Sequence, residues 1–194
     1  MKTIQEIYQE RELKRLKAAQ EIERILCKKL ELPTIRAGRI ALRDEREWKT
    51  NEISIEYSWM IKISVSFKGW CWLFVIKLGA NKFRDIQNPE TLMKGIFTLN
   101  GAGELEEFYL KKERIDFTDK VKDVKNVELY DTNNGITLDG VSYEYLLFGF
   151  NNEIRFYLNN PVSQNWRIWE KAVYTLGEKL SEESGSKYLT EIFQ

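Results

Sequence analysis

The clearest pattern in the chain is the alternation of hydrophobic and polar residues over positions 53–67. Hydrophobic side chains occupy every odd position from Ile53 to Phe67, and every even position except Met60 is polar. A period of two residues predicts a long β-strand with one buried face. Residues 70–78 are hydrophobic on both faces and follow Lys68-Gly69. The two segments therefore predict a hairpin whose second strand is central in an antiparallel sheet.

Hydrophobic residues at three- and four-residue spacing predict helices near both ends of the chain. The first helix covers about 3–31 and ends before Pro33, and Arg11 and Arg15 interrupt its hydrophobic stripe. The last helix covers about 161–180, after Asn160-Pro161. A third, short helix is predicted from Asn88-Pro89 to about Leu99, with asparagine as its cap and proline at its first position.

Residues 127–158 have the pattern of a β-meander, with turn dipeptides such as Asn134-Gly135 and Asn151-Asn152 between hydrophobic segments. The charge-dense residues 103–125 fit a helix or a strand equally well. We find no repeat and no linker. The sequence therefore predicts one α+β domain over 1–194. We expect a single antiparallel sheet of about five to seven strands, with the long N-terminal and C-terminal helices packed on one face.

The composition of the chain indicates its cellular location and shows a surplus of aromatic residues. Six Trp, nine Tyr and ten Phe supply enough apolar surface for a core and for an interface. The two cysteines, Cys27 and Cys71, are too few for a disulfide framework and predict reduced thiols. No apolar run is long enough for a signal peptide or a membrane-spanning helix. A cytoplasmic location is therefore expected, with no membrane partner.

The chain contains no histidine, and this narrows the chemistry available to it. Ser-His-Asp and Cys-His catalytic arrangements are excluded, and two distant cysteines do not make a zinc site. Asp131–Gly135 lacks the spacing of a calcium loop, and Gly101-Ala102-Gly103 lacks the residues of a phosphate-binding loop. The sequence predicts no catalytic residue, no cofactor and no metal, and hence a protein that is not an enzyme.

Two other functional classes stay open as alternatives. Acidic residues cluster at 104–107 and at 116–123, and a carboxylate-based enzyme needs two such groups across a cleft. The helix at 3–31 carries seven basic and six acidic side chains, a balance that disfavours nucleic acid as a partner. A nucleic-acid-associated accessory protein nevertheless remains an alternative. Whether the acidic segment 104–123 is functional or only solvated is left open, as is the oligomeric state.

Candidate residues for binding a protein partner come from three segments. Trp70 and Trp72 share one face of a strand, and paired aromatic residues suit either a core or an interface anchor. Basic side chains on the first helix and acidic ones after residue 103 offer charge complementarity. The full set is Arg11, Arg15, Trp70, Trp72, Glu104, Glu106 and Glu107.

The C-terminal third resembles a known class of proteins. Its parts are Leu138-Asp139-Gly140, a strand with Tyr143 and Tyr145, a strand with Phe156-Tyr157, and Asn160-Pro161 before a helix that contains tryptophan. Over residues 127–180 this order is similar to small bacterial α+β immunity proteins of polymorphic toxin systems. The resemblance implies a cytoplasmic, non-enzymatic protein that neutralises a toxin by protein–protein interaction. It carries over no binding residue.

Overall fold

The structure is a computed structural model that describes residues 3–44, 49–79, 91–114 and 140–194. The chain divides into two compact units, Met1–Arg36 and Ala37–Gln194. Each unit is described by itself below. The described residues include no helix that is both long enough and hydrophobic enough to cross a membrane.

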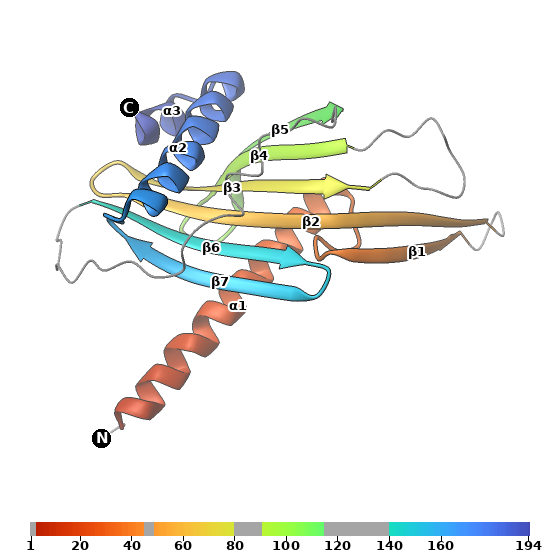
Figure 1. Ribbon diagram of the computed structural model, residues 1–194, viewed down its shortest axis with the longest axis horizontal. Coiled ribbons are helices and arrows are strands. Elements are labelled where there is room, and N and C mark those ends of the chain that lie inside the picture. The colour runs from red at the N-terminus through yellow and green to blue at the C-terminus, as the bar shows by residue number, and fades with distance from the viewer. Residues whose placement is uncertain (1–2, 45–48, 80–90, 115–139) are drawn as a thin grey trace. The chain divides into compact units, whose positions relative to one another are not determined.

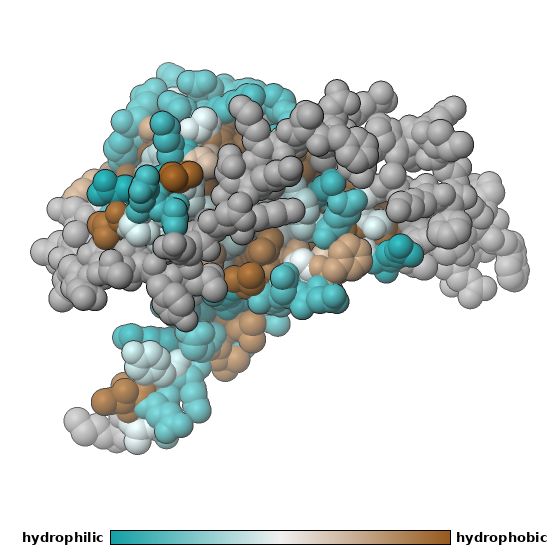
Figure 2. All heavy atoms as spheres, viewed as in Figure 1, coloured by the Kyte–Doolittle hydropathy of each residue, from teal (hydrophilic) through white to brown (hydrophobic). Residues whose placement is uncertain are grey.

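The first unit contains one helix, α1 (Ile4–Leu30), close to the predicted range of 3–31. Thr3 and Glu6 form a capping box at its start, and Glu31 ends it in the left-handed region with φ 56°. Ion pairs between residues three positions apart lie along it, Glu12–Arg15 at 2.9 Å and Glu21–Arg24 at 2.6 Å. Hydrophobic side chains alternate with hydrophilic ones along the part of α1 in view in Figure 2. Exposed ones in its first half are Ile4, Ile7, Tyr8, Leu13 and Leu16.

The second unit is a seven-stranded antiparallel sheet followed by two helices. Its strands are β1 (Gly38–Asp44), β2 (Lys49–Val65), β3 (Gly69–Leu78), β4 (Thr91–Leu99), β5 (Leu105–Arg114), β6 (Val141–Gly149) and β7 (Asn152–Asn159). The order across the sheet is β5-β4-β3-β2-β6-β7, and β1 also pairs with β2. Because β2 is long, β1 pairs with its first half and β6 pairs with its second half, and both lie along the same edge of β2 (Figure 1).

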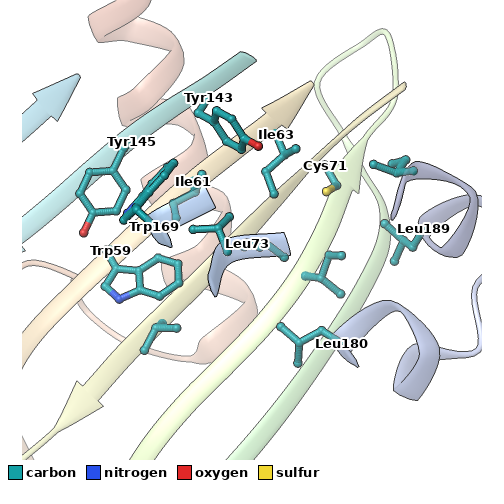
Figure 3. Packing of buried hydrophobic residues seen from close by; sticks show 14 of the residues in the cluster. Trp59, Ile61, Ile63, Cys71, Leu73, Tyr143, Tyr145, Trp169, Leu180 and Leu189 are labelled. Atoms are coloured by element: carbon teal, nitrogen blue, oxygen red, sulfur yellow. The ribbon is translucent and has the colours of Figure 1, made fainter. Parts of the chain in front are cut away.

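Helices α2 (Gln164–Ser184) and α3 (Lys187–Phe193) pack on one face of this sheet. The core between them consists of odd-numbered side chains of β2 and β3, of β6 tyrosines and of α2 tryptophans (Figure 3). Tyr143 contacts Trp169 edge to face, with ring centroids 5.2 Å apart, and Phe156 contacts Trp166 at 4.9 Å. Close aromatic contacts of this geometry stabilise a core beyond the area that they bury.

The α+β class, the antiparallel sheet and the central position of β3 between β2 and β4 are confirmed. The predicted turn at 151–152 also joins β6 to β7 as expected. The rest of the meander, 127–139, lies outside the described residues. That both terminal helices share one face of the sheet stays a prediction, as does a single domain over 1–194.

The helix predicted from Asn88-Pro89 to Leu99 is wrong, because residues 91–99 form strand β4. β4 pairs with β3 on one side and with β5 on the other, so its backbone hydrogen bonds are satisfied by the sheet. Residues 105–114, assigned to neither element from the sequence, form β5. α2 begins at Gln164 and not at 161, because the Ser163 side chain caps it by accepting from Trp166 N–H.

The second face of the sheet has both polar and aromatic residues at one end and is hydrophobic at its centre. Trp72, Phe74, Phe97 and Phe108 form an aromatic cluster there, with neighbouring ring centroids 5.9–6.4 Å apart. Gly95 lies under this cluster, since a Cβ atom on it would meet the Phe74 ring at 2.3 Å. Towards the β2–β3 turn, polar residues such as Lys62, Ser64 and Ser142 lie among aromatic ones, and the surface becomes concave.

Candidate functional site

An open groove of about 780 Å³ lies on the second face of the sheet, beside the β2–β3 turn. We call it the turn-end groove and define it by Lys62, Ser64, Phe67, Trp70, Glu144 and Tyr157. Its residues come from β2, β3, β6, β7 and the β2–β3 turn, all within the second unit. The β2–β3 turn, the start of β6 and the end of β7 lie together at one end of the sheet (Figure 1).

Sheet register places the groove residues, together with the buried Trp72, in two rows that cross four strands. Residues that face each other across antiparallel strands lie on the same face of a sheet. The outer row, from β3 to β7, is Trp70, Ser64, Ser142 and Asn159. The inner row is Trp72, Lys62, Glu144 and Tyr157. The even-numbered, polar face predicted for 53–67 thus forms part of the floor.

The β3 side of the groove is a cation–π pair. The Lys62 ammonium lies 4.6 Å from the centroid of the Trp70 ring. Trp70 is half-buried, so its ring is part of the groove surface. An ammonium group on an indole face is held in place electrostatically, and both groups remain available to a ligand.

The β7 side of the groove is a hydrogen-bonded pair. Tyr157 donates its hydroxyl to Glu144 Oε1 over 2.7 Å. Tyr157 is 42% exposed, so its ring also faces solvent. The groove therefore has an aromatic side chain on each of its two sides and a charged side chain next to each aromatic ring.

Phe67 lies at the mouth of the groove in the β2–β3 turn and is 96% exposed. Its φ angle is +65°, in the left-handed region that bulky side chains rarely adopt. The sequence pattern placed Phe67 at the end of the strand, but β2 ends at Val65. An exposed phenylalanine in a strained conformation costs free energy without contributing to the core, which points to a role at the surface.

A set of hydrogen bonds joins the strands at the end of the groove. Gly140 N–H donates to Ser66 Oγ over 3.0 Å, and Ser66 N–H donates to the Gly140 carbonyl over 3.0 Å. Val141 N–H donates to Asn160 Oδ1 over 2.8 Å. A Cβ atom on Gly140 would lie 1.8 Å from that Asn160 oxygen, so only glycine fits here. These bonds fix β2, β6 and β7 relative to one another and give the groove a defined shape.

Of the residues predicted to bind a partner, only Trp70 is one of the groove residues. Trp72, on the same strand face, is 4% exposed and stacks on Phe97, so it belongs to the core. Glu104 lies next to the β4–β5 turn, where its Oε2 accepts from Asn100, and Glu106 and Glu107 lie at the start of β5.

The two predicted arginines lie on α1 in the first unit, and both are exposed. Arg15 donates to Glu12 within that helix. The groove residues that were not predicted from the sequence are Lys62, Ser64, Phe67, Glu144 and Tyr157. Tyr157 and Phe67 had a visible signal, because each is an aromatic residue beside a turn or on a polar strand face. Lys62 and Glu144 had none, since their proximity depends on the pairing of β2 with β6.

A second group of polar residues lies between the sheet and α2. Tyr143 donates its hydroxyl to Glu170 Oε1 over 2.5 Å, and burial together with this hydrogen bond raises the pKa of Tyr143 far above its usual range. This contact fixes α2 to β6. Within the described residues, no group of three or more cysteine, aspartate or glutamate side chains is arranged to hold a metal ion. Asp116, Asp119 and Asp123 lie outside the described residues.

Comparison with models of protein families, with curated proteins and with solved structures finds no match to this chain.

Proposed function

We propose that this protein is a protein-binding module that uses the turn-end groove, and that its specific role is that of an immunity-type protein that neutralises a toxin by binding it. The observation that carries the proposal is Phe67, which is almost fully exposed at the mouth of a groove with aromatic sides. Large aromatic side chains at the centre of an interface contribute most of its binding energy. Phe67, Trp70 and Tyr157 supply three of them on one surface.

The mixed character of the groove also supports a protein partner. Interfaces of proteins that exist both free and bound combine aromatic anchors with hydrogen-bonding groups that tolerate water. The groove combines its aromatic residues with serine hydroxyls, one ammonium group and one carboxylate. The role in toxin neutralisation rests on the resemblance of residues 127–180 to immunity proteins, and a cytoplasmic location belongs to the same proposal.

The test is co-expression of this chain with the product of each adjacent open reading frame. We expect one of these products to inhibit growth when expressed alone, to lose that effect in the presence of this chain, and to co-purify with it stoichiometrically. Phe67→Asn and Trp70→Ala should each weaken the complex at least about thirty-fold, the effect of an interface residue that contributes about 2 kcal/mol.

Ile168→Asn is the matched control, because Ile168 is also an exposed hydrophobic residue, 53% exposed, but lies on α2. It should leave the complex and the protection unchanged. Circular dichroism of each variant separates loss of binding from loss of folding. If neither neighbouring product binds this chain or is neutralised by it, the immunity proposal is wrong. If a complex forms and both groove variants retain it, the groove is not the interface.

A further inference from the structure

The charged residues at the centre of the turn-end groove are direct neighbours, yet they do not pair. Lys62 on β2 and Glu144 on β6 face each other in the sheet register, a position that favours a cross-strand ion pair. The Lys62 ammonium lies on the Trp70 ring instead, and the Glu144 carboxylate accepts from Tyr157. Among the described residues neither forms an ion pair with any partner. The two charges therefore point to opposite sides of the groove.

This arrangement leaves hydrogen-bonding capacity unused on both sides of the floor, as a donor on Lys62 and as an acceptor on Glu144. An ammonium group carries three N–H donors, and a cation–π contact supplies none of them with an oxygen acceptor. Glu144 uses Oε1 for the Tyr157 hydroxyl, so Oε2 is available to accept a further hydrogen bond. Both side chains are half-buried. A ligand that covers them must offer an acceptor to Lys62 and a donor to Glu144, because unsatisfied buried charges are costly.

The presence of one charge of each sign in the same groove selects against a ligand group with a net charge. Lys62 and Glu144 stand on neighbouring strands, so a cation attracted by Glu144 is also repelled by Lys62, and an anion meets the reverse. A peptide group avoids this conflict, since it has a carbonyl acceptor and an N–H donor and a dipole of about 3.5 D. In an extended segment laid across the floor, one such carbonyl meets Lys62 and one such N–H meets Glu144.

The width of the groove gives the length of the ligand. Trp70 on β3 and Tyr157 on β7 are three strand spacings apart, about 14 Å, which corresponds to about four residues of extended chain. A free amino acid covers only about one quarter of this width. A loop or strand of a protein partner covers it completely and can place side chains against both rings.

We infer that the turn-end groove binds an extended, uncharged segment of the partner protein through its main chain, with one peptide carbonyl on Lys62 and one peptide N–H on Glu144. This inference rests on the proposed function and specifies the part of the partner that enters the groove. Phe67 and Trp70 then provide hydrophobic contacts on the β3 side of the bound segment, and Tyr157 provides them on the β7 side.

The test is a titration of the full chain with capped tetrapeptides. Binding is monitored through the ¹⁵N–¹H signal of the Trp70 indole, which is assigned by its disappearance in Trp70→Phe. The probe is acetyl-tetraalanine-amide, compared with versions that carry one aspartate or one lysine. We expect saturable binding of the neutral peptide, at least five-fold tighter than that of either charged version. The affinity should change less than two-fold between 50 and 500 mM NaCl, because no net charge is neutralised.

Two pairs of variants examine the contacts directly. Lys62→Met and Glu144→Leu should each weaken binding of the neutral peptide at least five-fold. Glu144→Gln should retain it within about two-fold, because the amide oxygen of glutamine also accepts a hydrogen bond. Lys111→Met removes a lysine outside the groove and should leave the affinity for the neutral peptide unchanged.

Tighter binding of a charged peptide, strong salt dependence, equal binding of free alanine, or no saturable shift would each overturn the inference. The co-expression experiment uses none of these peptides. A failed titration beside an intact, groove-dependent complex therefore removes only the inference about main-chain binding. Loss of the complex itself removes the proposed function.

Discussion

At the scale of single residues, Phe67 is the most exposed of the large hydrophobic side chains in the described part of the chain, and its backbone conformation is unfavourable. Its φ of +65° is typical of glycine and asparagine. Phe67→Asn should raise the free energy of unfolding by about 0.5–1 kcal/mol, because asparagine tolerates the left-handed region and no buried contact is lost. Chemical denaturation measures this change. Phe67→Ala is the control and should have little effect, since alanine keeps the same conformational penalty.

A gain in stability together with a loss of partner binding in Phe67→Asn would mean that the residue is retained for function at a cost in stability. A Phe67→Asn variant less stable than the natural protein would contradict this explanation. It would show that the phenylalanine ring makes a contact that its exposure does not indicate.

The tryptophans at 70 and 72 show how far single residues could be interpreted from the sequence. Alternation along the strand correctly placed both on one face. It could not separate their roles, because Trp72 is covered through its stacking on Phe97 of β4 and Trp70 lies further towards the turn. Burial depends on which neighbouring strand extends past a residue, and this is set by register and not by local sequence.

At the scale of elements, the C-terminal part of α2 is tied to the sheet by a network of charges. Glu183 accepts from Lys111 Nζ over 2.6 Å and from the Tyr109 hydroxyl over 3.2 Å, and Lys94 pairs with Glu113 at 2.9 Å. The hydrogen bond from Lys111 lowers the pKa of Glu183, and the hydrogen bond from Lys94 lowers that of Glu113. The network joins α2, β5 and β4 through side chains from all three elements.

A lowered carboxyl pKa in the folded state makes stability depend on pH in a defined direction. The contribution of Glu183 is fully present above its unfolded pKa of about 4.3 and is lost as pH falls through the lower folded pKa. Glu183→Gln should therefore lose stability less steeply than the natural protein below about pH 4.5, as measured by denaturation at a series of pH values.

Lys111→Met should flatten the same acid limb, because it removes the strongest cause of the shift at Glu183. Glu178→Gln changes an exposed glutamate on the same helix and is the matched control. Equal acid limbs in the natural protein and in Glu183→Gln would show that this contact does not stabilise the fold.

Strand β4 marks the limit of predicting elements from local sequence. An Asn-Pro start and a Gly after Asn100 are ordinary helix boundaries, and residues 91–99 contain no strict alternation. Their strand conformation follows from β3, which is hydrophobic on both faces and needs a partner on each edge. The long alternation in β2 was predictable because its periodicity is local. The groove was not, because it is built by pairing β2 with a strand that lies 76 residues further along the chain, from Val65 to Val141.

At the scale of the whole molecule, the absence of histidine and the burial of tyrosines and cysteines determine the pH range of stability. No side chain with an ordinary pKa titrates between about pH 6 and 8, since histidine is absent. Burial raises the pKa of Cys71, Tyr143 and Tyr145 above their usual ranges, and that of Tyr174 to about 12. Each of these groups has a folded pKa above its unfolded one.

The stability that these groups contribute is fully present below their unfolded pKa values and is lost as pH rises towards the folded ones. We therefore expect the free energy of unfolding to be constant from about pH 6 to 8. It should fall above about pH 8.5 as the cysteines of the unfolded chain ionise, and more steeply above pH 10 as its tyrosines do.

Tyrosine absorbance at 295 nm, recorded with circular dichroism, should show that Tyr143, Tyr145 and Tyr174 ionise together with unfolding. Tyr174→Phe removes the group whose folded pKa is about 12 and should make the alkaline limb shallower. Ionisation of all tyrosines near pH 10 in a still folded protein would contradict the buried positions of Tyr143 and Tyr145 and the half-buried position of Tyr174.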